Sequence, residues 1–458
     1  MIRIRNILLL LRAHLWPIPL LISLASLGLA YVVLSYGAAI FDALDVERSG
    51  LWWLYGGDAS TARGLLSSLL SGLMTMTSLV VSVTFVILTV SAQQLGPRLV
   101  AIFMGDRQIQ AVLGLFIGTI LYLLVVLRSI DDALGKGGVP HLAVTVGSLL
   151  TVACLFALLF YVHKIARSIV ADNVVEVVAA DLRHNIAAML PHRDGGETAE
   201  RVPPTIDPPP MGEIALGRSG SIQVVDYARL LTIAAKRDLV LRVTVRAGHF
   251  VLAEGRHVIV HGPGTLNEPA IAGIREAFVI GLERSPAQDL EFGIRQLVEI
   301  GLRALSSGIN DPFTAIAVVD HLAVALEDIL HRPLQPVVLR DEEGLVRVVA
   351  DRSSITGLVD AAYDPLRQAA SGMPPVLVRM ADILGQLAPS LRDEAAVGAV
   401  LTQLDKIAQT ARQPGLAPAD RDSILDRLAH ARAAVEEHAR LACPQPSGAR
   451  VRDRADIR

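Results

Sequence analysis

Hydroxyl side chains recur at helical spacing along one apolar stretch of the chain, residues 65–90. Steps of three, four and seven residues place them on one face of an α-helix that extends over the whole stretch. The face ends near an amide side chain, Gln93. Its members are Ser68, Ser71, Thr75, Ser78, Ser82 and Thr89.

Two interpretations of this hydroxyl face remain open from the sequence. In a membrane, a continuous polar face can line a water-filled path. Alternatively, Ser and Thr hydroxyls bond to the carbonyls of their own helix or join neighbouring helices. A second row at Thr77, Thr84 and Ser91 lies beside the first at seven-residue steps, and the same two interpretations apply to it.

A second pattern is a ladder of charges that alternate in sign at four-residue steps. Its members are Glu291, Arg295, Glu299 and Arg303. On a helix these residues form i,i+4 pairs, which are typical of a surface that faces solvent or a partner. A regulatory contact is the sharper alternative. Ser285 followed by Pro286 predicts the N-terminal cap of this helix, which should continue to Leu305.

The ladder is followed by a helix break at 306–310 and a new helix start. Asp311 before Pro312 predicts an N-cap, and that helix should extend to about Leu330. Asn310 and Asp311 lie at the turn, so the predicted cytosolic interaction surface comprises the four ladder residues together with these two.

The sequence shows no pattern typical of an active site. It lacks a phosphate-binding loop, a dinucleotide-binding glycine motif, a His-Glu-x-x-His motif and a nucleophile elbow. His249, His257 and His261 lack the companion cysteines or patterned carboxylates of a metal site. Cys154 and Cys443 do not suggest a disulfide framework. We therefore expect no enzyme activity, no metal and no cofactor.

Four long apolar stretches in the first part of the chain are predicted to be membrane-spanning helices. The chain is 52% hydrophobic and 19% charged, and its charges lie mostly after residue 163. Four stretches are long enough to cross a bilayer, at 15–40, 65–90, 109–127 and 142–162. None contains Asp, Glu, Lys or Arg, which argues against an ion-coupled pump. Gly114 and Gly118 predict close helix packing in the third stretch.

Basic residues in the loops predict the orientation of these stretches. The set on one side is Arg3, Arg5, Arg12, Arg98, Arg107, Lys164 and Arg167, and the smaller set opposite is Arg48, Arg63, Arg128 and Lys136. The positive-inside rule then places both termini in the cytosol and Arg98 at the cytosolic end of the second stretch. We expect a multi-pass protein of the bacterial inner (plasma) membrane.

The whole chain is predicted to be an all-α membrane region followed by a cytosolic α+β domain and a C-terminal helical region. The four-helix membrane domain with a helical stalk occupies 1–190, and a proline-rich linker occupies 191–218. The α+β domain is 219–350, with strands at 221–225 and 239–245, a helix at 227–236 and a hairpin at 336–349. The helical region is 351–442, and 443–458 should be disordered.

Several segments together resemble a family of bacterial predicted membrane proteins that is defined only as a domain of unknown function. They are Gln94–Arg98, His163–Ser168, Gln288–Val298 and Arg303–Pro312. Ser307 stands where the family pattern would have proline. The resemblance implies four membrane spans and a cytosolic domain, and it implies no activity.

Two functional hypotheses follow. The first is a homo-oligomeric channel or passive transport protein with a cytosolic regulatory domain. In it several copies of the second span surround an axis, with Arg98 at the cytosolic mouth. The candidate pore-lining residues are Ser71, Thr75, Ser78, Ser82, Thr89 and Gln93. The second is a membrane-anchored scaffold or sensor that binds a cytosolic partner or ligand. The net charge of -3 argues against nucleic acid, so the expected partners are the lipid bilayer and further copies of the chain.

Overall fold

The computed structural model describes residues 16–43, 57–95, 106–131, 139–168, 171–190, 206, 209–334 and 336–442. The chain divides into two compact units, Met1–Asn173 and Val174–Arg458. Arg98 and the tail after residue 442, which carries the prediction of disorder, lie outside the described residues.

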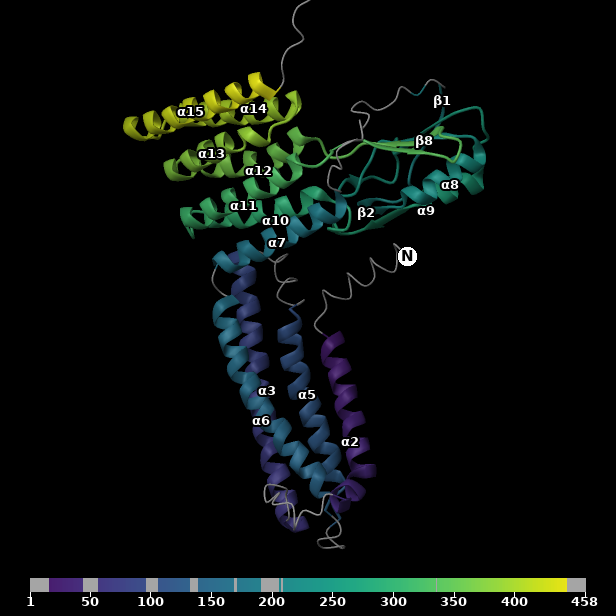
Figure 1. The fold of residues 1–458 in the computed structure, drawn as a ribbon, viewed down its shortest axis with the longest axis vertical. Helices are drawn as coiled ribbons and strands as arrows, with labels where there is room; N and C mark the ends of the chain where they lie inside the picture. The colour runs from purple at the N-terminus through teal and green to yellow at the C-terminus, as the bar shows by residue number, and fades with distance from the viewer. Residues whose placement is uncertain are drawn as a thin grey trace, which may run out of the picture. The chain divides into compact units, whose positions relative to one another are not determined.

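The first unit contains four long helices, which confirm the four predicted spans (Figure 1). They are α2 (Pro17–Ala43), α3 (Ala59–Leu95), α5 (Arg107–Arg128) and α6 (His141–Ser168). Each is long and apolar enough to cross a membrane. Helix α3 begins earlier than the apolar stretch predicts, because Asp58 accepts a hydrogen bond from the Thr61 amide and so satisfies a donor of the polar first turn.

Helix α5 is the central helix of this unit. In its most apolar stretch 61% of the residues are buried, compared with 17% in the corresponding stretches of α2 and α3. Gly114 and Gly118 lie against α2, as their spacing predicts. A Cβ added at Gly114 would lie 3.0 Å from the Cα of Pro19, and one at Gly118 would lie 2.5 Å from the Oγ of Ser26. The two helices therefore approach closely, with backbone against Gly114 and the Ser26 side chain against Gly118.

Helix α7 (Ala171–Met189) belongs mostly to the second unit. The apolar residues that predict an amphipathic stalk, Val174, Val178, Leu182 and Ile186, are buried. Leu182 packs on Gly293 of α10, which leaves no room for a Cβ there. Residues 169 and 170, between α6 and α7, lie outside the described residues.

Two sheets form the α+β part of the second unit. The first has the strand order β1-β5-β3-β8-β7, and the second β4-β2-β6. The strands are β1 (Pro210–Ile214), β2 (Gly220–Val225), β3 (Val240–Val243), β4 (Phe250–Val251), β5 (Val258–His261), β6 (Phe278–Gly281), β7 (Val337–Arg340) and β8 (Val346–Ala350). Helices α8 (Tyr227–Arg237) and α9 (Glu268–Glu276) complete it. Among the described strands, only β3 and β8 pair in parallel, and their buried Leu241 and Val348 face each other in register.

Strand β1 lies inside the stretch expected to be a linker, so that part of the linker prediction is wrong. The strand occupies the sheet edge, where proline at a strand start is tolerated. It pairs with β5, and Ile214 faces Val258 in register. The local composition conceals a strand that forms through long-range pairing.

Six helices form the rest of the second unit and stack in layers (Figure 1). They are α10 (Leu290–Ala304), α11 (Pro312–Leu330), α12 (Ile355–Ala369), α13 (Pro374–Gln386), α14 (Glu394–Ala411) and α15 (Pro418–Ala442), with a short 3₁₀ turn, η2 (Ala388–Ser390). Asp311 is the N-cap of α11, as predicted. The cap predicted at Ser285 is wrong, since α10 starts later and Asp289 caps it. Gln288 bonds instead to both backbone groups of Val225.

Candidate functional site

The hydroxyl face of α3 lies on the surface of the membrane unit. All of its members are exposed, namely Ser68, Ser71, Thr75, Ser78, Ser82 and Thr89. The Thr75 hydroxyl donates to the carbonyl of Ser71 at 3.0 Å, and the Thr89 hydroxyl donates to that of Phe85 at 2.8 Å. These two threonines are therefore satisfied by their own helix and do not join α3 to its neighbours in the chain.

The packed side of α3 is the side opposite this face. Leu66, Leu73 and Val80 are almost fully buried and repeat at seven-residue steps. Each hydroxyl two positions away, such as Ser71 or Ser78, points roughly 200° around the helix from them. The hydroxyl face is thus directed away from the rest of the unit.

The second hydroxyl row has a different role. Thr84 donates to the carbonyl of Val80 and also contacts the hydroxyl of Tyr161 on α6. Thr77, in the same row, donates to the carbonyl of Leu73 at 2.7 Å. This row, in which the side chain of Ser91 is not described, therefore includes a hydroxyl, that of Thr84, which joins α3 to α6. The structure therefore separates two rows that the sequence could not distinguish.

The exposed faces of the other membrane helices are of a different composition. The exposed residues of α2 include Leu21, Leu24 and Tyr31, and those of α6 include Phe156 and Leu159. Such side chains are suited to contact with lipid tails. On α3, exposed apolar residues such as Leu79 and Phe85 flank the hydroxyl face. Gln93 lies within α3, but its side chain is not described, and Arg98 lies outside the described residues.

The charge ladder on α10 forms the two i,i+4 ion pairs that its spacing predicts. Arg295 lies 3.1 Å from Glu291, and Arg303 lies 3.5 Å from Glu299. Glu291, however, is not a solvated residue, because its side chain is only 12% exposed. Its other oxygen accepts a hydrogen bond at 2.8 Å from Arg246, which follows β3. Glu291 therefore joins the helical part of the unit to the α+β part.

A pocket of about 580 Å³ opens beside Glu291. Its lining residues are Arg246, Gly248, His249, Phe250, Arg284, Glu291, Arg295, Gly357, Asp360 and Ala361. Sequence reasoning identified only Glu291 and Arg295 among these as surface residues. The structure shows why glycine stands at position 248 in this lining: its φ is +90, and a Cβ there would lie 2.4 Å from Asp289 and 2.7 Å from Arg284.

Charges in and behind the pocket are arranged around two carboxylates. Asp289 is buried and accepts a hydrogen bond from Arg284 at 2.7 Å. Burial raises the pKa of Asp289 against the opposing effect of Arg284. For Glu291, burial acts in the same direction but is outweighed by hydrogen bonds from Arg246 and Arg295, which lower its pKa. Burial, and then Arg246, lower the pKa of His249, which favours its neutral form.

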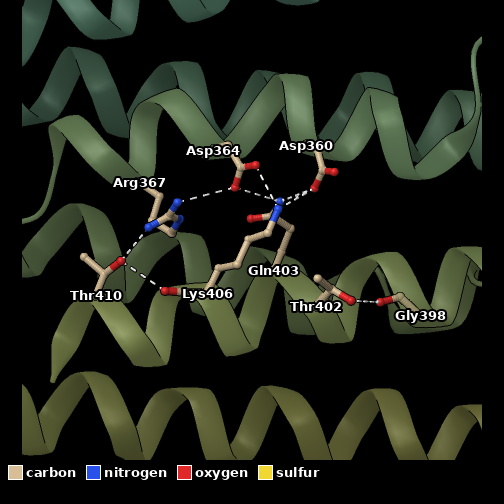
Figure 2. Close-up of polar contacts among 8 residues, drawn as sticks. All are labelled: Asp360, Asp364, Arg367, Gly398, Thr402, Gln403, Lys406 and Thr410. Carbon is tan, nitrogen blue, oxygen red and sulfur yellow. Dashed lines mark hydrogen bonds and ion pairs between the residues drawn. The ribbon is translucent and has the colours of Figure 1, made fainter.

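Asp360, on the opposite wall, belongs to a polar network between α12 and α14 (Figure 2). Its Oδ1 accepts from Lys406 at 2.8 Å and from Gln403 at 2.7 Å. Lys406 also donates to Asp364 at 2.8 Å, and Arg367 lies 3.6 Å from Asp364. Two carboxylates thus face two cations, and the network holds the backbone of α12 beside the pocket.

The turn between α10 and α11 does not contribute to the pocket lining. Asn310 has a positive φ of 52, a conformation that asparagine tolerates better than most residues. Asp311 accepts bonds from the amides of Phe313 and Thr314 and from the Thr314 hydroxyl. These bonds lower the pKa of Asp311, and they show that its role in the structure is to cap α11.

Four apolar helices and a second unit of α+β and helical structure define an integral membrane protein. The model of the family described as Predicted membrane protein (DUF2254) matches residues 12–386, and the chain belongs to this family. This confirms the resemblance noted in the sequence. All the pocket residues lie within the matched region.

Two mycobacterial relatives are similar over most of their length. An uncharacterized protein of Mycobacterium tuberculosis, Rv1290c, is 28% identical over 405 residues, which cover 86% of this chain and 76% of that protein. An uncharacterized protein of Mycobacterium bovis, Mb1321c, matches to the same extent. No solved structure matches the chain at a significant level.

Proposed function

We propose that this protein is a homo-oligomeric channel or passive transport protein of the bacterial inner (plasma) membrane, with a cytosolic regulatory domain. The observation that carries the proposal is the outward orientation of the α3 hydroxyl face. Several copies of the chain, with these faces turned toward a shared axis, would enclose a polar path. The candidate lining residues are Ser71, Thr75, Ser78, Ser82 and Thr89, and Gln93 at the helix end.

The contrast between exposed faces supports this arrangement over simple contact with lipid. Large apolar side chains cover the exposed faces of α2 and α6. On α3 a continuous row of hydroxyls lies between exposed apolar residues such as Leu79 and Phe85, and Ser60 and Gly64 continue the row toward the N-terminal end. Small residues let helices approach closely, and hydroxyls tolerate water. Both properties suit the inner surface of an oligomer.

The loop charges supply the proposed orientation. More Lys and Arg residues lie on the side of the two termini than on the opposite side, so we place the termini and the second unit in the cytosol. Arg98 would then stand at the cytosolic mouth of the path. The absence of acidic residues from the apolar stretches leaves the sign of a transported ion open.

Solute flux across liposome membranes tests the proposed path. Liposomes that contain purified full-length protein should release entrapped small ions or small neutral solutes. The double variant Ser78→Leu, Ser82→Leu should reduce that flux at least severalfold. Phe156→Leu, on the exposed apolar face of α6, is the matched control and should leave flux unchanged. Wild-type protein without flux would refute the channel, and unchanged flux in the double variant would refute the lining.

A second candidate function is a membrane-anchored sensor or scaffold, and the pocket beside α10 favours it. Glu291 and Arg295, which sequence analysis assigned to an interaction surface, line a cavity of ligand size. In this case the hydroxyl face would only join copies of the chain. A protein that binds a ligand at the pocket and conducts nothing would favour this function over the conduit.

A further inference from the structure

We propose that the pocket beside α10 binds a small phosphorylated ligand with a planar ring, of the nucleoside monophosphate class. This inference deepens the sensor function but is independent of the conduit, since the site lies wholly in the second unit. It rests on three features of the pocket: its charge, its exposed aromatic wall and its size.

The charge of the pocket favours an anion. Three guanidinium groups, those of Arg246, Arg284 and Arg295, meet around the carboxylates of Glu291 and Asp289. Arg284 also lies 3.8 Å from Glu291, so one carboxylate holds three arginines near one another. With both carboxylates ionised, these five groups carry one net positive charge, and Asp360 on the α12 wall is offset by its ion pair with Lys406.

The type of cation favours phosphate in particular. A guanidinium offers five N–H donors, so the one or two carboxylate contacts of each arginine leave further donors available. Paired guanidinium donors match the geometry of phosphate oxygens. Arg295 has a 56% exposed side chain that is anchored at one end by Glu291, so it is held in place and still open to a ligand. Arg246 and Arg284, which are about a quarter exposed, lie deeper.

The aromatic wall favours a planar ring. Phe250 lies in β4, lines the pocket and is 66% exposed, although phenylalanine is usually buried. A base that stacks on its ring would cover this apolar surface. On the α12 wall, Oδ1 of Asp360 is used by Lys406 and Gln403 (Figure 2), whereas Oδ2 is directed to no member of that network and suits a ligand hydroxyl.

The volume fits a ligand of this size. A pocket of about 580 Å³ lies within the range of sites for small organic ligands, roughly 300–1,000 Å³. Bare phosphate would leave most of this space and the Phe250 ring unused. The ligand should therefore bind through its phosphate and its ring together.

Isothermal titration calorimetry on the detergent-solubilised full chain tests the site, with AMP, GMP, CMP and UMP as probes. At least one should bind, inorganic phosphate should bind at least tenfold more weakly, and adenosine and guanosine should give no heat. Arg295→Ala should weaken nucleotide binding about tenfold or more. Arg303→Ala is the matched control, because it carries the other i,i+4 pair of the same helix outside the pocket, and it should change nothing.

Phe250→Ala distinguishes the contribution of the ring to binding from that of the phosphate. The substitution is suitable because an exposed side chain can be removed without a loss of packing. It should weaken the nucleotide and leave inorganic phosphate unchanged. No binding by any of the four nucleotides would overturn the proposal, as would equal losses in Arg295→Ala and Arg303→Ala. Tighter binding of dioctanoyl phosphatidic acid than of every nucleotide would identify a lipid headgroup as the phosphate source and would overturn the ring assignment.

Discussion

Two faces of small residues in the membrane unit differ in what covers them. On α5, Gly114 and Gly118 lie in direct contact with α2, and no room remains for a larger side chain. On α3, the face from Ser60 to Thr89 points away from the other described helices of the membrane unit. The same kind of surface is thus occupied in one helix and uncovered in the other.

Composition alone therefore does not determine whether a face of small or polar residues packs against its own chain. The face of α5 is explained by the fold of one chain, whereas that of α3 is not. The other described exposed faces of the membrane helices are largely apolar and suit contact with lipid. The hydroxyl face of α3 is therefore the part of the membrane unit that most needs a partner outside the chain. In our proposal that partner is water within an assembly of copies.

The largest expected effect is from filling the occupied face. Gly114→Leu should lower the free energy of unfolding by about 3 kcal/mol, because the new side chain must displace the backbone at Pro19. Thermal unfolding in detergent measures it. Gly28→Leu on α2 is the control, since a Cβ there would meet no described atom within 4 Å apart from its chain neighbours and the backbone of its own helix. Equal losses in both variants would mean that α2 and α5 do not pack as described.

The next largest effect concerns Glu291, a carboxylate whose partners all lie within the chain. Glu291→Gln should lower the free energy of unfolding by about 2 kcal/mol at pH 7, because three arginines lose their shared carboxylate. Chemical denaturation followed by circular dichroism would measure the loss. Glu299→Gln, which affects a single pair with Arg303, should cost less than about 1 kcal/mol.

The pH dependence of this loss has a definite sign. The pKa of Glu291 is lowered in the folded state, so its contribution is complete above the unfolded pKa and is lost as pH falls through the folded pKa. The difference between wild type and Glu291→Gln should therefore shrink below a pH of about 4. A difference that grows toward acid pH would contradict the assignment.

The smallest effect compares the two hydroxyl rows of α3. Thr84→Val removes a contact with Tyr161 and should cost about 0.6 kcal/mol. Thr75→Val removes only a bond to its own helix and should cost close to nothing in the isolated chain. Thermal unfolding of the two variants side by side measures the difference. A larger loss at Thr75 would mean that the first row, rather than the second, joins helices of the chain.

The elements that sequence analysis predicted well are those with local signals. Apolar length revealed the four spans, and Asp311 before Pro312 revealed the start of α11. Strand β1 and the Asp289 cap were missed because distant partners determine them. Ile214 pairs with Val258, and Gln288 bonds to the backbone of Val225, which leaves Asp289 as the cap.

The sites were predictable to different degrees. The hydroxyl face follows from spacing, but its outward direction depends on which side of α3 meets α5 and α6. The pocket could not be predicted, because its walls come from β4, α10 and α12, more than a hundred residues apart at the extremes. The spacing of the ladder identified Glu291 and Arg295, but that Glu291 is largely buried against Arg246 is known only from the structure.

Water accessibility of α3 tests the central claim most directly. In a Cys154→Ala, Cys443→Ser background, single cysteines at Ser71, Ser78 and Ser82 would be exposed to a charged, membrane-impermeant thiol reagent in reconstituted protein. We expect all three to react, whereas cysteines at Phe156 and Leu159, on the apolar exposed face of α6, should not. If the α3 cysteines are as unreactive as those on α6, the hydroxyl face meets lipid or another helix, and the proposed path does not exist.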